Sequence, residues 1–292
     1  MKKYLKVFIV FVCVMFCCFN SFAAVVDTLE VKSEVIQKNI KAAVVLPQSY
    51  KTVQQNYPVI YLLHGGQGNY RDWLSKTDDK LLLHKLADQY NFIIVTPDAG
   101  LTSYYFDSPL DKASQYETFI TKELVQKIDD SYRTIKDRKG RIIAGLSMGG
   151  HGAMYLSARH PELYCAAGSM SGVMNINTAT WTVPAEFAQS RNKNFEHLLG
   201  PPKDAANPYR EYSAVGLVDK MKTNDVKLIF DCGIDDIMIK PNRELHQLLL
   251  ANGTPHEYTE RPGKHEWPYW SNAVSYQFLF FQKVMSSINS IK

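Results

Sequence analysis

One stretch, residues 142–150, constrains the fold of this chain more than any other. It reads Ile-Ile-Ala-Gly-Leu-Ser-Met-Gly-Gly and contains the pattern Gly-x-Ser-x-Gly, with β-branched and small residues before it and helix-compatible residues after it. That order predicts a nucleophile elbow, in which a strand ends in a sharp, strained turn and a helix begins. Gly145 and Gly149 suit the turn because neighbouring backbones approach closely there. We expect Ser147 to stand exposed at the tip, in front of the positive end of the helix.

The rest of the chain alternates strand-like runs with stretches of helical periodicity. The strand-like runs lie at residues 59–63, 92–95, 165–170, 226–230 and 256–259. Apolar residues recur at helical spacing in residues 78–90, 116–132, 242–252 and 269–287. Residues 27–46 alternate polar and apolar around a break at 37–39, which predicts an antiparallel hairpin at the edge of the sheet. This order predicts one α/β domain over residues 24–292, with a mostly parallel central sheet and helices on both faces.

Two segments lack a clear period. Residues 173–212 are irregular and rich in proline, and a long irregular insert in a compact domain is usually functional. We expect this insert to be a lid or a wall of a pocket. The loop at residues 100–114 follows a central strand, so it is expected to open at the same sheet edge as Ser147.

Residues 1–23 have the pattern of a secretory signal peptide. Three lysines precede an apolar run, and small residues at positions 21 and 23 match the two positions that a signal peptidase recognises. The apolar run is shorter than the roughly 20 residues of a spanning helix. The sequence therefore predicts cleavage after Ala23, no stable membrane insertion afterwards, and a periplasmic or extracellular location. A lipoprotein attached through Cys17 or Cys18 is a lesser alternative, because a bulky aromatic residue precedes them.

Charge and cysteine usage exclude several classes of function. The formal net charge is +4, three of these positive charges lie in the N-terminal segment, and no basic stretch indicates a nucleic-acid partner. Outside that segment, Cys165 and Cys232 each lie in an apolar strand-like run, which favours buried free thiols over a disulfide. No Cys/His cluster has the spacing of metal ligands, so neither a metal nor a cofactor is expected.

A nucleophilic serine needs a base within hydrogen-bond reach and an acid that orients the base. After an elbow of this kind the chain order is serine, acid, histidine. Loops that follow predicted strands after Ser147 offer Asp231, Asp235 and Asp236, and then His265. Asp236 is preferred because it lies deepest in its loop, whereas Asp231 is expected to point along the sheet. Asp235 remains a rival.

Eight histidines are present, and His265 is the one in a loop after the last predicted strand. His151 lies on the helix after the elbow, and we expect it to pack beside the site rather than serve as the base. His64 comes before the acid, in a glycine-rich loop. The other five lie in predicted helices, at a helix end, in the insert or at the start of a strand.

Acyl transfer also needs an oxyanion hole. It combines the N–H group after the nucleophile with an N–H group from the loop after an early strand. Met148 would supply the first. Gly66, in the glycine-rich loop at 64–68, is preferred for the second, with Gly65 and Gln67 as alternatives. A phosphate-binding loop is disfavoured because the Gly-Lys-Ser/Thr ending of that motif is absent.

Four blocks of sequence together resemble the esterase D-like family. They are Tyr-Leu-Leu-His-Gly-Gly-Gln-Gly at 61–68, Gly-Leu-Ser-Met-Gly-Gly-His-Gly-Ala at 145–153, Asp-Cys-Gly-x-x-Asp at 231–236 and Gly-Lys-His-Glu-Trp at 263–267. This family includes feruloyl and acetyl-xylan esterases, S-formylglutathione hydrolases and the antigen 85 mycolyltransferases. The resemblance covers nearly all of the chain after residue 23. It implies an α/β-hydrolase fold, acyl transfer from a carboxylic ester, and an acid at Asp236.

The expected enzyme is thus an exported serine esterase without a cofactor. Ser147 would attack the ester carbonyl, His265 would take the serine proton, Asp236 would orient His265, and water would release the acyl group. One alternative is an acyltransferase, which shares the acyl-enzyme but passes the acyl group to another acceptor. The other is a non-catalytic carbohydrate-binding protein on this scaffold, although such a protein has no need for a complete triad.

Aromatic residues near the expected site suggest the substrate. Trp267 and Trp270 flank His265 in sequence, and Tyr104 and Tyr105 lie in the loop at 100–114. Flat aromatic faces suit a phenolic acyl group and the apolar face of a sugar ring. Together with export, they predict a small-molecule or oligosaccharide ester, most simply a feruloyl or acetyl ester of a plant-wall polysaccharide such as xylan. The alternative is that these rings pack beneath the loops, which applies especially to Trp267.

Overall fold

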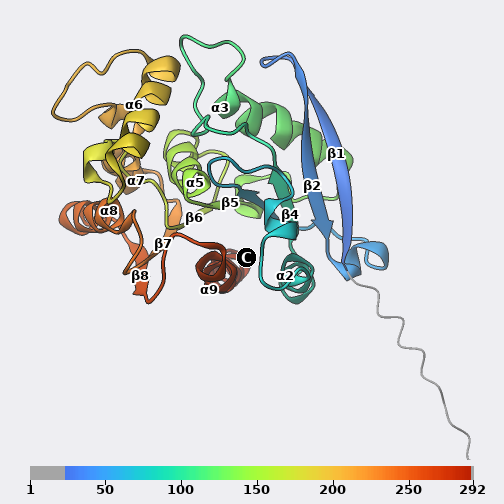
Figure 1. The fold of residues 1–292 in the computed structure, drawn as a ribbon. Coiled ribbons are helices and arrows are strands. Elements are labelled where there is room, and N and C mark those ends of the chain that lie inside the picture. The colour runs from blue at the N-terminus through green and yellow to red at the C-terminus, as the bar shows by residue number, and fades with distance from the viewer. Residues whose placement is uncertain (1–23, 291–292) are drawn as a thin grey trace, which may run out of the picture.

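The computed structural model describes residues 24–290, so the expected signal segment at 1–23 lies outside the described residues. An eight-stranded sheet forms the centre of the molecule, in the order β1-β2-β4-β3-β5-β6-β7-β8 (Figure 1). The strands are β1 (Val25–Ser33), β2 (Lys38–Leu46), β3 (Val59–Leu63), β4 (Ile93–Pro97), β5 (Arg141–Leu146), β6 (Ala166–Met170), β7 (Lys227–Gly233) and β8 (His256–Arg261). β2 pairs antiparallel with β1 and with β4, and the other neighbours are parallel.

The helices occupy both faces of this sheet. They are α1 (Asp72–Ser75), α2 (Leu82–Tyr90), α3 (Tyr116–Thr118), α4 (Val125–Ser131), α5 (Met148–Arg159), α6 (Ala185–Leu199), α7 (Val218–Thr223), α8 (Ile239–Asn252) and α9 (Trp267–Ser290). The 3₁₀ turns are η1 (Gln48–Lys51), η3 (Arg138–Gly140), η4 (Thr178–Thr180), η5 (Arg210–Tyr212) and η6 (Ala214–Gly216), and η2 (Phe119–Leu124) is a π-helical turn. Among residues 24–290, none of these helices has the length and hydrophobicity that crossing a bilayer requires.

The continuous apolar runs of the inner strands follow from burial on both faces. Every residue of β3, β4, β5 and β6 is buried. Alternate residues of β3 point into two cores: Tyr61 and Leu63 belong to the core that also contains residues of α4 and α5, whereas Ile60 and Leu62 belong to the core that contains residues of α2 and α9. Figure 1 shows α2 and α9 side by side on one face of the sheet. Such two-sided burial is typical of parallel strands, and the predicted fold class is confirmed.

Several boundaries differ from those expected from sequence. The hairpin turns at residues 34–37, so the predicted break at 37–39 falls partly inside β2. The helix expected at 78–90 begins at Leu82, and the one expected at 116–132 contains a wider π-helical turn, η2, between α3 and α4. β7 continues to Gly233, so Asp231 lies within the strand. Gly253 ends α8 with φ +73°, as its position after the periodic stretch indicated.

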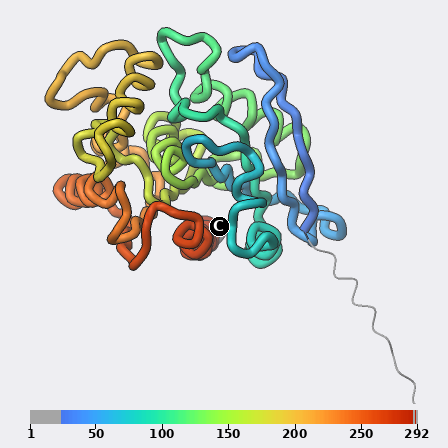
Figure 2. The backbone as a smooth tube through the Cα atoms, viewed as in Figure 1, coloured from blue at the N-terminus to red at the C-terminus, as the bar shows by residue number. Residues whose placement is uncertain are grey.

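The insert at 173–212 is not irregular throughout, because α6 forms 15 of its residues. Sequence periodicity missed this helix since Phe195 and Leu198 are its only buried side chains, which leaves a weak apolar stripe. Figure 2 shows the insert at the same end of the molecule as the loop at 100–114.

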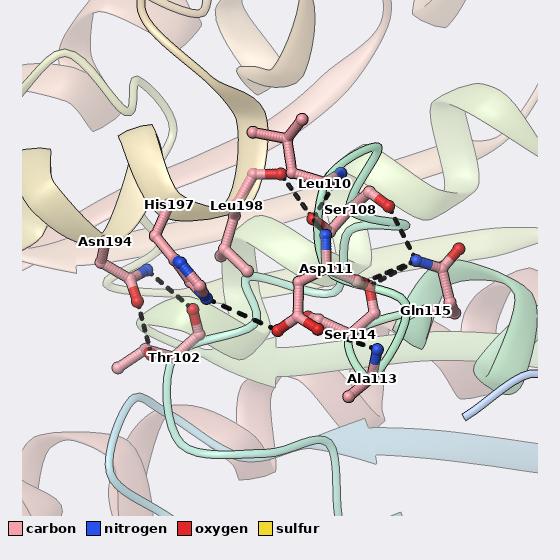
Figure 3. Close-up of polar contacts among 10 residues, drawn as sticks. All are labelled: Thr102, Ser108, Leu110, Asp111, Ala113, Ser114, Gln115, Asn194, His197 and Leu198. Atoms are coloured by element: carbon pink, nitrogen blue, oxygen red, sulfur yellow. Dashed lines mark hydrogen bonds and ion pairs between the residues drawn. The ribbon is translucent and has the colours of Figure 1, made fainter. Parts of the chain in front are cut away.

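Hydrogen bonds join α6 to that loop (Figure 3). Thr102 donates from its hydroxyl to the side-chain oxygen of Asn194 at 2.7 Å, and the Asn194 amide donates back to the Thr102 carbonyl at 2.9 Å. The Ser108 hydroxyl donates to the Leu198 carbonyl at 2.6 Å. The insert and the loop therefore pack as one layer outside the sheet.

Candidate active site

The strand, turn and helix of the elbow lie where the motif placed them. β5 ends at Leu146, Ser147 has φ +52° and ψ −115°, and α5 begins at Met148. A positive φ is a strained conformation for a serine, and it persists because the surroundings fix it. The Ser147 N–H donates to the Met170 carbonyl at 2.9 Å, and the Ser147 carbonyl accepts the Val173 N–H at 3.2 Å.

The elbow glycines are required by close backbone contact. A Cβ atom on Gly145 would lie 2.5 Å from the backbone of Gly149, and one on Gly149 would lie 2.5 Å from the Leu63 carbonyl oxygen. Side chains do not tolerate such distances, so only glycine fits at both positions. The packing of α5 against β5 and β3 depends on these two residues.

Three predicted side chains meet at the turn. His265 Nε2 lies 2.8 Å from Ser147 Oγ, and His265 Nδ1 lies 2.9 Å and 3.1 Å from the two carboxylate oxygens of Asp236. Ser147 and His265 are partly exposed, whereas Asp236 is buried and also accepts the Met238 N–H at 2.7 Å. A line of hydrogen bonds thus runs from a reachable hydroxyl to a buried carboxylate.

The other two candidate acids lie elsewhere. Asp235 is exposed, and its N–H donates to the Gly263 carbonyl at 3.1 Å. Asp231 is buried within β7 and accepts hydrogen bonds from Tyr269 and Gln277 on α9. Of the three aspartates, Asp236 alone contacts His265.

The glycine-rich loop borders the nucleophile. A Cβ atom on Gly65 would lie 3.5 Å from the Cβ of Ser147. The Gln67 N–H is occupied, because it donates to the Leu101 carbonyl at 2.7 Å. The N–H groups of Gly66 and Met148 have no hydrogen-bond partner within residues 24–290, which leaves both available to a bound oxygen.

His64 fixes the orientation of this loop. Its Nε2 accepts the Ala99 N–H at 3.0 Å, so the neutral ring carries its proton on Nδ1, which donates to the Gly65 carbonyl at 2.7 Å. Burial lowers the pKa of His64 and favours this neutral form. Because the peptide bond is planar and trans, holding the Gly65 carbonyl directs the Gly66 N–H to the opposite side.

His151 packs beside the site, as expected from its place on the helix. Its Nε2 lies 2.8 Å from the Tyr212 carbonyl, and its ring contacts those of Tyr104, Phe106 and Tyr155. Burial lowers its pKa to about 4, so it is neutral at neutral pH. It joins α5 to the loop at 100–114 and to the end of the insert.

Tyr104 and Tyr105 do not lie where the substrate prediction required. Their side chains are 5% and 0% exposed, so neither presents a face to a ligand. The Tyr105 hydroxyl donates to the His64 carbonyl at 2.9 Å, and the Tyr104 ring centroid lies 4.7 Å from that of Phe195 on α6. Both residues also have positive φ, and both side chains lie buried beneath the loop.

The two tryptophans differ in exposure. Trp270 is 7% exposed, and its ring stands edge-on to His265 with centroids 5.0 Å apart, so it supports the histidine rather than facing a substrate. Trp267 is partly exposed and packs edge-on against Trp73 and Trp270. Of the four aromatics proposed from sequence, Trp267 is partly exposed and the other three are buried.

The remaining expectations concern thiols and metals. Cys165 and Cys232 are buried free cysteines, as their apolar surroundings indicated. Within residues 24–290, no group of His, Cys, Asp and Glu side chains is arranged to hold a metal ion.

Sequence reasoning missed Leu101, whose carbonyl accepts the Gln67 N–H, because a backbone hydrogen bond does not depend on residue type and leaves no signal in the sequence.

Comparison with known proteins accords with this geometry. Residues 33–281 match the model of the family described as "Putative esterase". The chain belongs to this family. Its fold is the α/β-hydrolase fold, and it is a carboxylic-ester hydrolase.

Individual relatives are esterases too. The chain is 26% identical to an acetyl esterase of Caldicellulosiruptor saccharolyticus, over 86% of this chain and 96% of that protein. It is 34% identical to an endo-1,4-beta-xylanase/feruloyl esterase of Xylanibacter ruminicola, over 48% of this chain and 20% of that much longer protein. Among solved structures, a ferulic acid esterase superposes with a TM-score of 0.75 at 32% identity, covering 90% of this chain and 99% of the other.

Proposed function

We propose that this esterase is exported and releases feruloyl or acetyl groups from plant-wall polysaccharide such as xylan, through a triad of Ser147, His265 and Asp236. The observation that carries the proposal is the line of hydrogen bonds from Ser147 Oγ through His265 to Asp236. A serine in that position can be deprotonated as it attacks.

The proposed reaction proceeds through an acyl-enzyme. Ser147 Oγ attacks the ester carbonyl while His265 Nε2 takes the hydroxyl proton, and the same proton passes to the alcohol as the ester bond breaks. A water molecule then attacks the acyl-serine ester, giving its proton to His265, and the returning proton restores Ser147. Asp236 holds the proton of His265 on Nδ1 and stabilises the imidazolium that forms twice in the cycle.

The N–H groups of Gly66 and Met148 are proposed to hold the tetrahedral oxyanion. Support comes from their lack of other partners among the described residues, and from the nearness of Gly65 to Ser147. The hydrogen bond from His64 to the Gly65 carbonyl presets the Gly66 N–H before substrate arrives. Preorganised donors of this kind are usually the largest single contribution to catalysis.

The choice of acyl group rests on the relatives and on Trp267. The names acetyl esterase and ferulic acid esterase belong to proteins that match nearly the whole chain. Partly exposed Trp267 lies two positions from His265 and offers an aromatic surface for a phenolic acyl group or a sugar ring. The signal-like pattern at 1–23 supports an encounter with wall polymers outside the cytoplasm.

The test of this substrate proposal compares kcat/KM on methyl ferulate, acetylated xylan fragments and 4-nitrophenyl butyrate, with Ser147→Ala as the blank. The proposal expects ferulate or acetate release with an efficiency above that on the butyrate ester. Equal or better efficiency on butyrate, with no release from xylan fragments, would refute the carbohydrate assignment. Adding alcohol acceptors to the same assay would reveal an acyltransferase, because the acyl group would then appear on the alcohol rather than in free acid.

A further inference from the structure

Asp231 is a buried carboxylate that the proposed reaction does not use. It is 2% exposed and lies in β7, with its side chain facing α9. It accepts the Tyr269 hydroxyl at 2.8 Å and the Gln277 side-chain amide at 2.9 Å, and Arg261 Nη2 lies 3.1 Å from its Oδ1. Burial raises the pKa of Asp231, whereas the Arg261 guanidinium and the hydrogen bonds from Gln277 and Tyr269 oppose that rise by stabilising the charged carboxylate.

Two of these three partners lie at the ends of residues 261–269, the segment that carries His265. Arg261 is the last residue of β8, four positions before His265, and Tyr269 lies four positions after it, in the first turn of α9. The ring of Tyr269 also packs on the segment itself, because a Cβ atom on Gly263 would lie 2.4 Å from it. Both ends of the His265 segment therefore contact one side chain, Arg261 through an ion pair and Tyr269 through a hydrogen bond.

The same segment is joined to the loop that carries Asp236. The Ile234 N–H donates to the Arg261 carbonyl at 2.9 Å, and the Asp235 N–H donates to the Gly263 carbonyl at 3.1 Å. Asp231 lies in the strand that leads into the Asp236 loop. The His265 segment is thus joined to the Asp236 loop by backbone hydrogen bonds, and to Asp231 at its two flanks.

We propose that Asp231 is a positioning residue for catalysis: it clamps Arg261 and Tyr269 and so keeps His265 within hydrogen-bond distance of both Ser147 and Asp236. The proposal rests on the proposed role of His265 as the base. It follows from geometry, because misplacing a reacting group by about 1 Å can cost on the order of 100-fold in rate. Asp231 touches no reacting atom and acts only through His265.

Gln277 provides a matched control. Like Tyr269 it lies on α9 and donates one hydrogen bond to Asp231, but it is two helical turns farther from His265. Tyr269→Phe removes the hydroxyl and keeps the ring on Gly263, whereas Gln277→Met removes the amide and keeps the volume. Each variant deletes one bond to the same carboxylate, and Gln277→Met also deletes the 3.1 Å bond from the amide to the Ser169 carbonyl. A purely structural role therefore predicts that Gln277→Met loses at least as much melting temperature as Tyr269→Phe, and that neither variant changes kcat.

The experiment measures kcat, KM and melting temperature for the two variants on one ester substrate, with His265→Ala alongside. The proposal expects Tyr269→Phe to lower kcat about 10- to 100-fold with KM nearly unchanged, and Gln277→Met to keep kcat within about twofold. The NMR signal of the proton shared by His265 Nδ1 and Asp236 should persist in Gln277→Met and broaden or shift in Tyr269→Phe. Equal kcat in the two variants would overturn the proposal.

Further controls separate the ways in which the experiment can fail. Should Tyr269→Phe not fold, Arg261→Met tests the other flank: a lowered kcat supports the clamp, and an unchanged kcat refutes it. Should His265→Ala retain turnover, the proposed function itself fails. If His265→Ala is inactive while Tyr269→Phe and Gln277→Met have the same kcat, the proposed role of His265 is supported and the proposed role of Asp231 is refuted.

Discussion

His265 Nδ1 lies 2.9 Å from an oxygen of Asp236, and the Asp236 side chain is completely buried beneath it. The adjacent Asp235 is exposed and turns away into a backbone contact with Gly263. A carboxylate that is buried and also accepts the Met238 N–H has a fixed orientation, so it can fix the tautomer of the histidine in turn.

This arrangement predicts unequal effects of two neighbouring substitutions. Asp236→Asn should lower kcat by on the order of 10⁴, because an amide in that position favours the wrong histidine tautomer. Asp235→Asn should leave kcat within about twofold, since surface substitutions rarely matter. Steady-state kinetics of both variants on one ester tests this prediction. A larger loss of kcat in Asp235→Asn than in Asp236→Asn would show that Asp236 is wrongly assigned as the acid.

The elbow predicts a contrast between two glycines. Gly149→Ala would place a Cβ atom 2.5 Å from the Leu63 carbonyl oxygen, so we expect a loss of about 1–3 kcal/mol in unfolding free energy and a marked fall in kcat. Gly253→Ala, at φ +73° with nothing within 4 Å, should cost about 1 kcal/mol and spare kcat. Urea unfolding and kinetics on both variants test this. Full activity in Gly149→Ala would mean that the turn tolerates a side chain.

Burial of His151 predicts a loss of stability in acid. Its pKa is about 4 in the folded protein and 6.5 ordinarily, so between these values the unfolded chain binds a proton that the folded chain does not. Unfolding free energy should therefore fall as pH drops from 6.5 to 4, by roughly 3 kcal/mol from this group, with no contribution above pH 7.

His151→Gln supplies the control, because glutamine can donate to the Tyr212 carbonyl but does not titrate in this range. Urea unfolding at pH 7 and pH 4.5 should show a smaller acid-induced loss in the variant than in the parent protein. Parallel losses in the two proteins would exclude His151 as a source of the pH dependence.

Export predicts a specific N-terminus. If the segment at 1–23 is a signal peptide cleaved after Ala23, protein recovered from its native host should begin at Ala24. Edman sequencing or intact-mass measurement of the secreted fraction checks this. Recovery of the uncleaved Met1 terminus from the cytosol would refute export, without bearing on the esterase assignment.

Much of the fold and of the site was predictable because local chemistry dictates it. Gly145, Ser147 and Gly149 specify the elbow through backbone geometry that few other residues adopt. The inner strands are recognisable in the sequence as continuous apolar runs, because helices cover both faces of the sheet there. The order of Ser147, Asp236 and His265 along the chain follows from strands whose carboxyl ends meet at one edge.

The remainder depends on contacts that leave no local pattern. Tyr104 and Tyr105 were expected to face a substrate, but both are buried. Tyr104 packs against Phe195 of α6, and the Tyr105 hydroxyl donates to the His64 carbonyl. Helix α6 itself has too few buried residues to show a period. The contacts that Asp231 makes with both flanks of the His265 segment also leave no pattern in the sequence, since Arg261 and Tyr269 are 30 and 38 positions away from it.

The triad itself is tested most directly by turnover in Ser147→Ala, His265→Ala and the double variant, measured on one acetyl ester with folding verified by circular dichroism. Because the residues act as one unit, each single change should remove nearly all turnover, and the double variant should be hardly slower than either. Substantial turnover in Ser147→Ala, or a double variant whose loss is the product of the two single losses, would contradict nucleophilic catalysis by Ser147 with His265 as its base.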